Sequence, residues 1–251
     1  KYTIATGVKA RNLPHILPCA TLLLHTQHDK VRRLNTDKQQ VFSHVDHTLL
    51  KAVSTWSQVE ALCREAVDHG MATVCIPPSF VKRACEAFPA LKVCTVIGFP
   101  LGYSTMAVKL YEAQQALQEG AAEIDMVVNL GDVKAGNFDA VTEEIAALKA
   151  AAGQKVLKVI VETCYLTEQE KVALCHCVTK GGADYIKTST GFGTGGATLD
   201  DVKLFANHIG PKVKIKASGG IRTREDLEAF LAAGADRLGA SGALQAYAEK
   251  G

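Results

Sequence analysis

The sequence predicts an α/β protein folded as a (β/α)₈ TIM barrel, a single domain with an N-terminal extension. Short β-branched apolar runs alternate with amphipathic helical patterns, and eight such runs fit into about 210 residues. Aromatic residues make up only 6% of the chain while alanine and valine are plentiful, as is typical of helices packed on buried parallel strands. A doubly wound open sheet is the main alternative. That fold usually carries a glycine fingerprint after its first strand, where this chain has Asp46-His47-Thr48.

The eight expected strands are the β-branched apolar runs, each bounded by turn residues. In chain order they cover residues 41–50, 72–76, 93–99, 123–128, 156–162, 185–189, 213–218 and 237–240. The helical patterns between and after them begin near Trp56, Ser79, Thr105, Phe138, Thr167, Leu199, Arg224 and Ala243. Thr167 followed by Glu170 is the pattern of a capping box. A Gly-Ala pair at 120–121, 182–183 and 234–235 ends one helix and leads into the next strand.

Composition and charge exclude several classes of protein. The chain has 251 residues, 47% of them hydrophobic, which is enough to bury a large core and excludes a disordered region. Its 28 basic and 26 acidic residues give a net charge of +2, without the basic excess of a nucleic-acid binder. No apolar run reaches the roughly 18 residues that a membrane span requires. Eight cysteines scattered through apolar stretches, with no secretory signal, predict reduced thiols in a cytoplasmic protein.

The first forty residues differ from the rest of the chain. They hold two of the seven prolines and no sustained hydrophobic period, and four basic residues lie between Lys30 and Lys38. We interpret residues 1–40 as an N-terminal extension or leader, and residues 41–251 as the barrel domain.

Polar side chains at the carboxyl ends of the strands are the candidate site, because TIM-barrel active sites lie there. These residues are Asp46, Thr48, Cys75, Asp125, Asn129, Glu162, Thr163, Lys187 and Lys216. Lys187 and Lys216 lie on neighbouring strands and are expected to point into one barrel mouth. Burial and a second ammonium nearby both disfavour the charged form, so we expect a lowered lysine pKa and an amine that forms a Schiff base with a carbonyl. The alternative is that each lysine only pairs with a carboxylate such as Asp125 or Glu162.

Asp125 is the candidate for proton transfer. Strand alternation puts Asp125 and Glu123 on one face and Ile124 on the other. Within reach of two lysines, the Asp125 carboxylate is expected to stay ionised and to move protons through a water molecule. A purely structural ion pair is the alternative.

Three glycine-bearing loops follow the last three strands and form a candidate phosphate site. They are residues 189–193, 219–222 and 239–242, and each exposes backbone N–H groups where a helix begins. Arg222 adds a charge-assisted donor. Any one of these loops could simply be a glycine-containing turn with no binding role, but three such loops in succession favour a phosphorylated substrate. A metal site is not favoured, either at Cys175-His176-Cys177 or at His44-Val45-Asp46-His47, because neither segment completes a ligand set.

At these residues the sequence resembles the deoxyribose-phosphate aldolases, a class I family with a (β/α)₈ fold. The resemblance covers residues from about 42 to 244 and is carried by four segments. They read Asp-His-Thr-Leu-Leu at 46–50, Glu-Ile-Asp-Met-Val-Val-Asn at 123–129, Tyr-Ile-Lys-Thr-Ser-Thr-Gly-Phe at 185–192 and Lys-Ala-Ser-Gly-Gly-Ile-Arg at 216–222.

The resemblance implies a role for each matching residue. Lys187 would form the Schiff base, Lys216 would lower the Lys187 pKa, and Asp125 would shuttle protons. The implied substrate-binding residues are Asp46, Thr48, Cys75, Thr188, Gly191, Gly219, Gly220, Arg222, Gly239 and Ser241. Some relatives carry a lysine directly after Gly191, and this chain has Phe192 there, so Arg222 and the loop backbone must contribute more to phosphate binding.

The implied reaction is the reversible cleavage of 2-deoxy-D-ribose 5-phosphate to D-glyceraldehyde 3-phosphate and acetaldehyde, in cytoplasmic deoxyribonucleoside breakdown. The family needs no metal or organic cofactor and assembles as homodimers or homotetramers. Two other interpretations stay open from the residues alone. One is a Schiff-base barrel of transaldolase-like or ketose-bisphosphate aldolase type, and the other is a catalytically silent barrel that only binds sugar phosphates.

Overall fold

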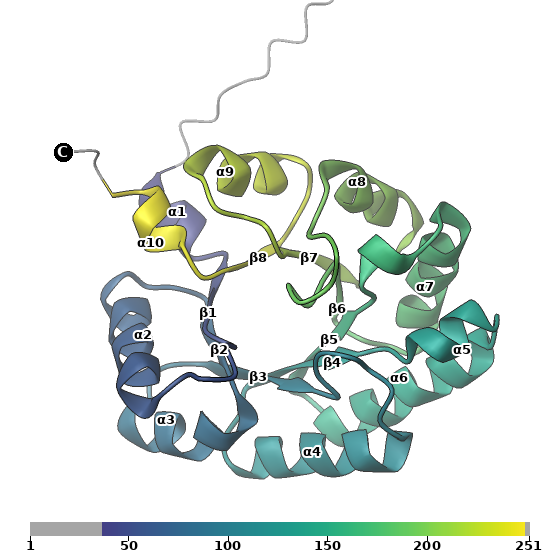
Figure 1. Ribbon diagram of the computed structural model, residues 1–251, viewed down its shortest axis with the longest axis horizontal. Coiled ribbons are helices and arrows are strands. Elements are labelled where there is room, and N and C mark those ends of the chain that lie inside the picture. The colour runs from purple at the N-terminus through teal and green to yellow at the C-terminus, as the bar shows by residue number, and fades with distance from the viewer. Residues whose placement is uncertain (1–36, 249–251) are drawn as a thin grey trace, which may run out of the picture. The chain divides into compact units, whose positions relative to one another are not determined.

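Eight parallel strands close into a barrel in the part of the chain that the computed structural model describes, residues 37–248 (Figure 1). Each strand pairs with its neighbours in sequence, and the first pairs with the last through Val45 and Leu238. The strands are β1 Val45–Thr48, β2 Thr73–Ile76, β3 Val93–Ile97, β4 Glu123–Val127, β5 Val156–Ile160, β6 Tyr185–Lys187, β7 Lys214–Ser218 and β8 Arg237–Ala240. The predicted TIM barrel is therefore confirmed, and the open sheet is wrong.

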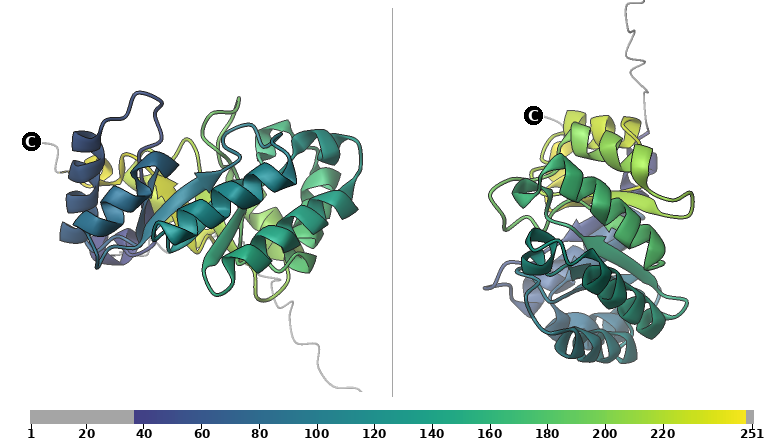
Figure 2. Two further views of the ribbon diagram at one scale, coloured as in Figure 1. Left: turned by 90° about the horizontal axis from the view of Figure 1, so that it is seen from below. Right: turned by 90° about the vertical axis from the view of Figure 1, so that its right-hand side faces the viewer.

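Helices surround the strands on all sides, as the side views also show (Figure 2). None of the helices in the described range combines the length and the apolar character needed to cross a membrane. Their bounds are α1 Lys38–Phe42, α2 Trp56–Asp68, α3 Val81–Ala87, α4 Met106–Gln118, α5 Leu130–Lys134, α6 Phe138–Ala152, α7 Glu168–Lys180, α8 Leu199–His208, α9 Arg224–Ala232 and α10 Ala243–Ala246, with 3₁₀ turns η1 Pro78–Phe80 and η2 Thr163–Tyr165.

Local sequence signals explain where several helices begin. The capping box at α7 is present: the Thr167 hydroxyl accepts from the Glu170 N–H at 3.3 Å, and the Glu170 carboxylate accepts from the Thr167 N–H at 2.7 Å. Thr223 and Asp226 make the same reciprocal pair at the start of α9. Such caps satisfy backbone N–H groups that have no partner inside the helix.

The first predicted strand is too long, and its beginning is a helix. Val41 and Phe42 belong to α1, which Asp37 caps, so β1 starts only at Val45. Phe42 is fully buried and meets the ring of Tyr247 after α10 edge-on at 5.4 Å, which places α1 beside α10 (Figure 1). The predicted boundary at residue 40 therefore falls inside α1, and the rest of the predicted extension lies outside the described residues. The five-residue helices α1 and α5 are too short to show a helical period in sequence.

The apolar core lies between the strands and the helices, whereas the barrel interior is polar. Outward-facing strand residues such as Ile124, Leu157 and Ile186 are fully buried against helix residues such as Ile145 and Leu148. The alternate residues of the same strands include buried charged groups, for example Asp125 and Lys158. This departs from the branched apolar layers that usually fill a TIM barrel.

A buried ion pair fastens α4 and α6 to the barrel. Lys109 is completely buried, and its ammonium donates to Glu144 Oε2 at 2.8 Å and to the Val127 carbonyl at 2.9 Å. Burial raises the pKa of Glu144, although its hydrogen bond to Lys109 works against that rise.

We expect Lys109→Met to lower the free energy of unfolding by about 3 kcal/mol, because it leaves the Glu144 carboxyl and the Val127 carbonyl without their buried donor. Urea unfolding measures the loss. The double variant Lys109→Met/Glu144→Leu should recover part of it, and Lys82→Met on the surface of α3 should cost less than about 0.5 kcal/mol. A Lys109→Met variant as stable as the surface control would contradict this account.

Candidate active site

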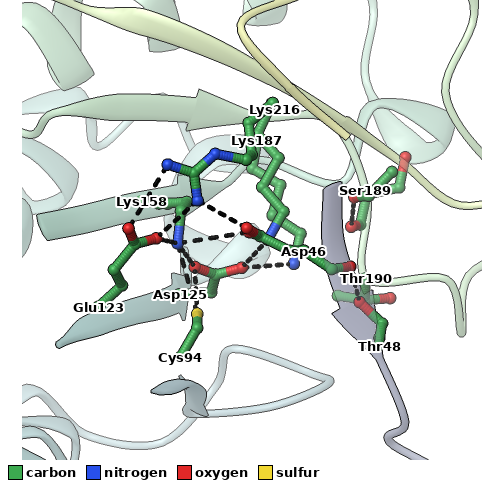
Figure 3. Close-up of polar contacts among 12 residues, drawn as sticks. Asp46, Thr48, Cys94, Glu123, Asp125, Lys158, Lys187, Ser189, Thr190 and Lys216 are labelled. Atoms are coloured by element: carbon green, nitrogen blue, oxygen red, sulfur yellow. Dashed lines mark hydrogen bonds and ion pairs between the residues drawn. The ribbon is translucent and has the colours of Figure 1, made fainter. Parts of the chain in front are cut away.

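Seven charged side chains from six strands meet inside the barrel. They are Asp46 of β1, Glu123 and Asp125 of β4, Lys158 of β5, Lys187 of β6, Lys216 of β7 and Arg237 of β8, and Figure 3 labels all of them except Arg237. All but Arg237 are less than 5% exposed. Four cations thus face three carboxylates at a depth where unpaired charges are expensive.

Asp125 lies at the centre of this charged cluster. Its Oδ2 accepts from the ammonium groups of Lys187 and Lys216, both at 2.8 Å. Its Oδ1 accepts from Lys158 at 2.8 Å and from the thiol of Cys94 at 3.2 Å. Burial alone would raise the pKa of Asp125, but the three ammonium groups hold it well below its ordinary value. The carboxylate therefore stays ionised, as the sequence predicts.

Lys216 bridges two carboxylates, and this corrects the sequence interpretation. Its ammonium donates to Asp46 Oδ2 as well as to Asp125 Oδ2. Burial lowers the pKa of Lys216, but these two carboxylates raise it more, so it lies above the ordinary lysine value. The lowered pKa expected for a buried strand lysine is thus wrong for Lys216, because that expectation weighed a neighbouring ammonium and left out Asp46. Gly239 leaves room for this side chain, since a Cβ there would lie 3.3 Å from Lys216 Cε.

Lys158 and Arg237 complete the charged cluster, and the sequence analysis missed both. The Lys158 ammonium lies 2.5 Å from Glu123 Oε2, 2.8 Å from Asp125 Oδ1 and 3.6 Å from Asp46 Oδ2. Arg237 donates to Asp46 at 2.6 Å and to Glu123 at 3.1 Å. Lys158 carries the signal that selects Lys187, a lysine inside an apolar strand, so the same criterion applied to every strand would have found it.

A cavity of about 400 Å³ opens above Lys187 at the carboxyl ends of the strands. Seven of the implied substrate-binding residues line it, together with Leu49, Leu50, Lys51, Thr190, Phe192, Ser218, Ile221 and Ala240; the seven are Thr48, Gly191, Gly219, Gly220, Arg222, Gly239 and Ser241. Its charged lining residues are Lys51, Lys187 and Arg222, and no aspartate or glutamate is among the described residues around it. The cavity therefore attracts anions.

Three implied substrate-binding residues lie outside this cavity. Asp46 is fully buried in the charged cluster. Cys75 is also fully buried, packed with Cys94 and Val96, so it does not line the cavity as expected. Thr188 joins β6 to β7, because its hydroxyl donates to the Ser218 carbonyl and accepts from the Ser218 N–H, both at 3.1 Å.

Glu162 holds the loop that follows β6. It is 2% exposed and adopts a left-handed backbone with φ of 56°, which is uncommon for a residue other than glycine. Its carboxylate accepts from the Thr190 N–H at 3.1 Å and from the Thr190 hydroxyl, which in turn accepts from the Phe192 N–H at 3.0 Å. The alternative that Glu162 pairs with a site lysine is wrong, since its hydrogen bonds go to the glycine loop.

The other candidate residues serve local structure. Asn129 caps α5 by accepting from the Gly131 N–H at 3.0 Å. His47 pairs with Glu65 at 2.7 Å on the helix side of β1, and His44 bonds the Asp236 carbonyl, so these histidines do not converge on one point. Two buried sets bring possible metal ligands within 4.8 Å of one another, Cys75, Cys94 and Asp125 in one and Asp46, Cys94 and Glu123 in the other. Their carboxylates already bind ammonium or guanidinium groups.

Fold and site together define the class as a TIM-barrel protein with a buried cluster of lysines and carboxylates below a cavity at the carboxyl ends of its strands. The DeoC/LacD family of aldolases matches residues 40–247. This chain therefore belongs to the DeoC/LacD aldolase family.

Individual relatives agree with this assignment. A deoxyribose-phosphate aldolase of Clostridium botulinum (strain Alaska E43 / Type E3) is 57% identical over 206 residues, which cover 82% of this chain and 93% of that protein. That of Clostridioides difficile (strain 630) is 56% identical over 204 residues, 81% and 93% of the two chains. Among solved structures, the tetrameric deoxyribose phosphate aldolase from Aeropyrum pernix superposes with a TM-score of 0.77 at 35% identity, over 83% of this chain and 90% of that one. An aldolase named QR15 gives a TM-score of 0.79 at 40% identity, over 81% and 92%.

We expect Thr190→Val to loosen the loop after β6, because it removes the hydroxyl that links the Glu162 carboxylate to the Phe192 N–H. Amide hydrogen exchange at residues 190–193 should quicken about tenfold, the effect of losing one hydrogen bond to a charged group. Thr179→Val, which removes a hydroxyl on α7 that accepts from the Gly210 N–H, is the matched control and should leave residues 190–193 unchanged. Equal exchange in both variants would rule out the link.

We expect the charged cluster to stabilise the fold over a wide pH range and to fail in acid. The folded-state pKa values of Asp46 and Asp125 lie below the unfolded value of about 3.9, so their stabilisation is present above that pH and is lost as the pH falls toward the folded values. The raised pKa of Lys216 keeps its contribution up to about pH 10. Urea unfolding from pH 2.5 to 9 measures this profile. Asp125→Asn should give a shallower acid slope, and an unchanged slope would contradict the assignment.

Proposed function

We propose that this chain catalyses the reversible aldol cleavage of 2-deoxy-D-ribose 5-phosphate to D-glyceraldehyde 3-phosphate and acetaldehyde. The observation that carries the proposal is Lys187, which lies below an anion-attracting cavity with its ammonium 2.8 Å from the ionised carboxylate of Asp125. The relatives named deoxyribose-phosphate aldolase, 53 to 57% identical to this chain, support the choice of substrate.

Lys187 is the amine best suited to form a Schiff base. It is the only lysine of the charged cluster that lines the cavity, so a carbonyl can reach it. It contacts one carboxylate, whereas Lys216 contacts two and Lys158 three. The charged cluster holds four cations and three carboxylates, so loss of one proton from Lys187 leaves three charges of each sign. Deprotonating the lysine with the fewest carboxylate partners breaks the fewest ion pairs, so Lys187 loses its proton at the lowest cost in electrostatic energy.

The reaction then follows from amine chemistry. The Lys187 amine adds to the aldehyde carbon of the open-chain sugar, and loss of water gives the iminium. The iminium accepts the electron pair of the bond between C2 and C3 as that bond breaks, and the C3 hydroxyl loses its proton as glyceraldehyde 3-phosphate leaves. Protonation of the resulting two-carbon enamine and hydrolysis release acetaldehyde and regenerate the amine.

Asp125 is the proposed proton carrier, and Lys216 is the cation that stays beside it. Asp125 Oδ2 contacts both Lys187 and Lys216, so a proton can pass between these groups, or through a water molecule, without a large movement. Lys216 is held protonated by its two carboxylates and so supplies the positive charge that pairs with Asp125 once Lys187 is uncharged. Asp46 also accepts from the Lys216 ammonium and so helps to hold it in position.

The loops around the cavity are the proposed phosphate site. Gly191, Gly219, Gly220 and the 239–241 segment line the cavity together with Arg222, and their backbone N–H groups are the proposed donors to the phosphate. Gly191, Gly219 and Gly220 have φ between 78° and 85°, a backbone conformation that favours glycine because it has no Cβ.

The proposed setting is the cytoplasm. Seven cysteines of the described residues are free, and most are buried, which suits a reducing compartment. The proposed ligands are the sugar phosphate and acetaldehyde, and the tetrameric relative from Aeropyrum pernix supports a homodimer or homotetramer.

Borohydride reduction in the presence of acetaldehyde tests the proposal. We expect a stable two-carbon adduct that peptide mass spectrometry locates on Lys187, because reduction converts the iminium to a secondary amine. The adduct should be absent in Lys187→Ala and retained in Lys82→Ala, an exposed lysine on α3. No adduct on the wild-type chain would overturn the Schiff-base mechanism. Transfer of a three-carbon ketol unit would favour transaldolase chemistry, and phosphate binding without turnover would favour a binding protein.

A further inference from the structure

Two cations lie at the opening of the cavity without an ion-pair partner among the described residues. Arg222 follows β7 and Lys51 follows β1, and both are exposed. The Arg222 backbone N–H donates to Asp226 at 3.0 Å, and the Lys51 carbonyl accepts from the Ser54 N–H and hydroxyl at 3.0 and 2.7 Å. The backbone of each residue is thus anchored while its charged end is left free. Unpaired cations beside a cavity that lacks carboxylates are available to an anionic ligand.

The strand order places these two cations in the loops on either side of the loop that follows β8. Around the barrel, β7 pairs with β8 and β8 pairs with β1. The segment 239–241 at the end of β8 therefore lies between the loop that holds Arg222 and the loop that holds Lys51. A phosphate bound to the N–H groups of 219–220 and 239–241 would have one cation on each side.

Position 192 cannot supply a further cation. Phe192 lines the same cavity and is 55% exposed, and its ring meets the ring of Phe99 edge-on at 5.3 Å. Lys187, the remaining cation of the cavity, is committed to Asp125 and to the proposed Schiff base. A phosphate that carries nearly two negative charges is therefore left with Arg222 and Lys51 as its charged partners.

We infer that Lys51 binds the phosphate of the substrate, as the second cation opposite Arg222. The inference rests on the proposed function, because it identifies a further ligand of the same sugar phosphate. Lys51 lies in the segment that continues from Thr48, Leu49 and Leu50, all of which line the cavity, so the loop after β1 is part of the substrate site. This role differs from that of Lys187, since Lys51 would contact the phosphate and leave the reacting carbons untouched.

Steady-state kinetics on two substrates test the inference. Lys51→Ala should raise KM for 2-deoxyribose 5-phosphate about tenfold, the loss of one charge-assisted contact, with kcat changed less than about twofold. Cleavage of unphosphorylated 2-deoxyribose should be unchanged, because that sugar has no phosphate to bind. Lys51→Arg should restore most of the loss, and Lys82→Ala, which removes an exposed lysine outside the cavity, should match the wild type. An unaltered KM in Lys51→Ala, or equal losses on both sugars, would overturn the inference.

Inorganic phosphate separates this inference from the proposed function. Phosphate should raise the melting temperature of the wild type and of Lys82→Ala, and the phosphate concentration needed for half of that shift should be about tenfold higher for Lys51→Ala. A wild type that binds phosphate through Lys51 but cleaves no deoxyribose 5-phosphate would defeat the proposed function and leave the phosphate site intact. A wild type that cleaves the sugar, with equal phosphate binding in all variants, would defeat the inference alone.

Discussion

The ionised carboxylate of Asp125, held between three buried ammonium groups, is the interaction on which this structure depends. Taking one such charge out of water costs several kcal/mol, and the cost is offset only when every partner is in place. Asp125 binds Lys158 through one oxygen and Lys187 and Lys216 through the other, and Asp46 and Glu123 take up the remaining bonds of Lys216, Lys158 and Arg237. The strands that carry these residues must therefore keep one register around the whole barrel. A slip of one residue would turn each charge outward into the apolar layer beneath the helices.

The residues of the charged cluster differ in how completely they are paired and in whether they reach the cavity. Lys158 and Arg237 are fully engaged with carboxylates and hold the others in position. Lys187 has a single carboxylate partner and faces the cavity. Around it, the Glu162 and Thr190 pair shapes the loop after β6, while Arg222 and Lys51 leave their charges available. The proposed Schiff-base lysine is thus the cation of the charged cluster with the fewest carboxylate partners, and local rules of charge pairing are commonly broken at functional sites.

Much of this arrangement could be predicted from sequence, and the gaps have physical causes. Lys187, Lys216 and Asp125 were predicted because polar residues that end apolar strands meet at one end of a parallel barrel. Lys158 satisfies the same rule and was overlooked, while Arg237 opens its strand and gives no such signal. The pKa of Lys216 was predicted in the wrong direction because Asp46 lies 170 residues away in the chain. Cys75 and Thr188 were expected to contact substrate, but their depth and their hydrogen bonds depend on how neighbouring strands pack, which a single strand does not reveal.

The sequence by itself determined the fold class, the order of the strands and the choice of Lys187, Lys216 and Asp125 as candidate residues. These features rest on local periodicity, on turn residues and on strand alternation, all of which act over a few neighbouring residues. Only the tertiary structure decided which charges pair, which residues reach the cavity and where two cations lie without an ion-pair partner among residues 37–248. Those outcomes depend on closure of the barrel, which brings Arg237 to within 2.6 Å of Asp46 across 191 positions of sequence. The strength of a buried ion pair depends on the distance between its charges and on how much hydration they lose. Both are set only when the first and last strands pair.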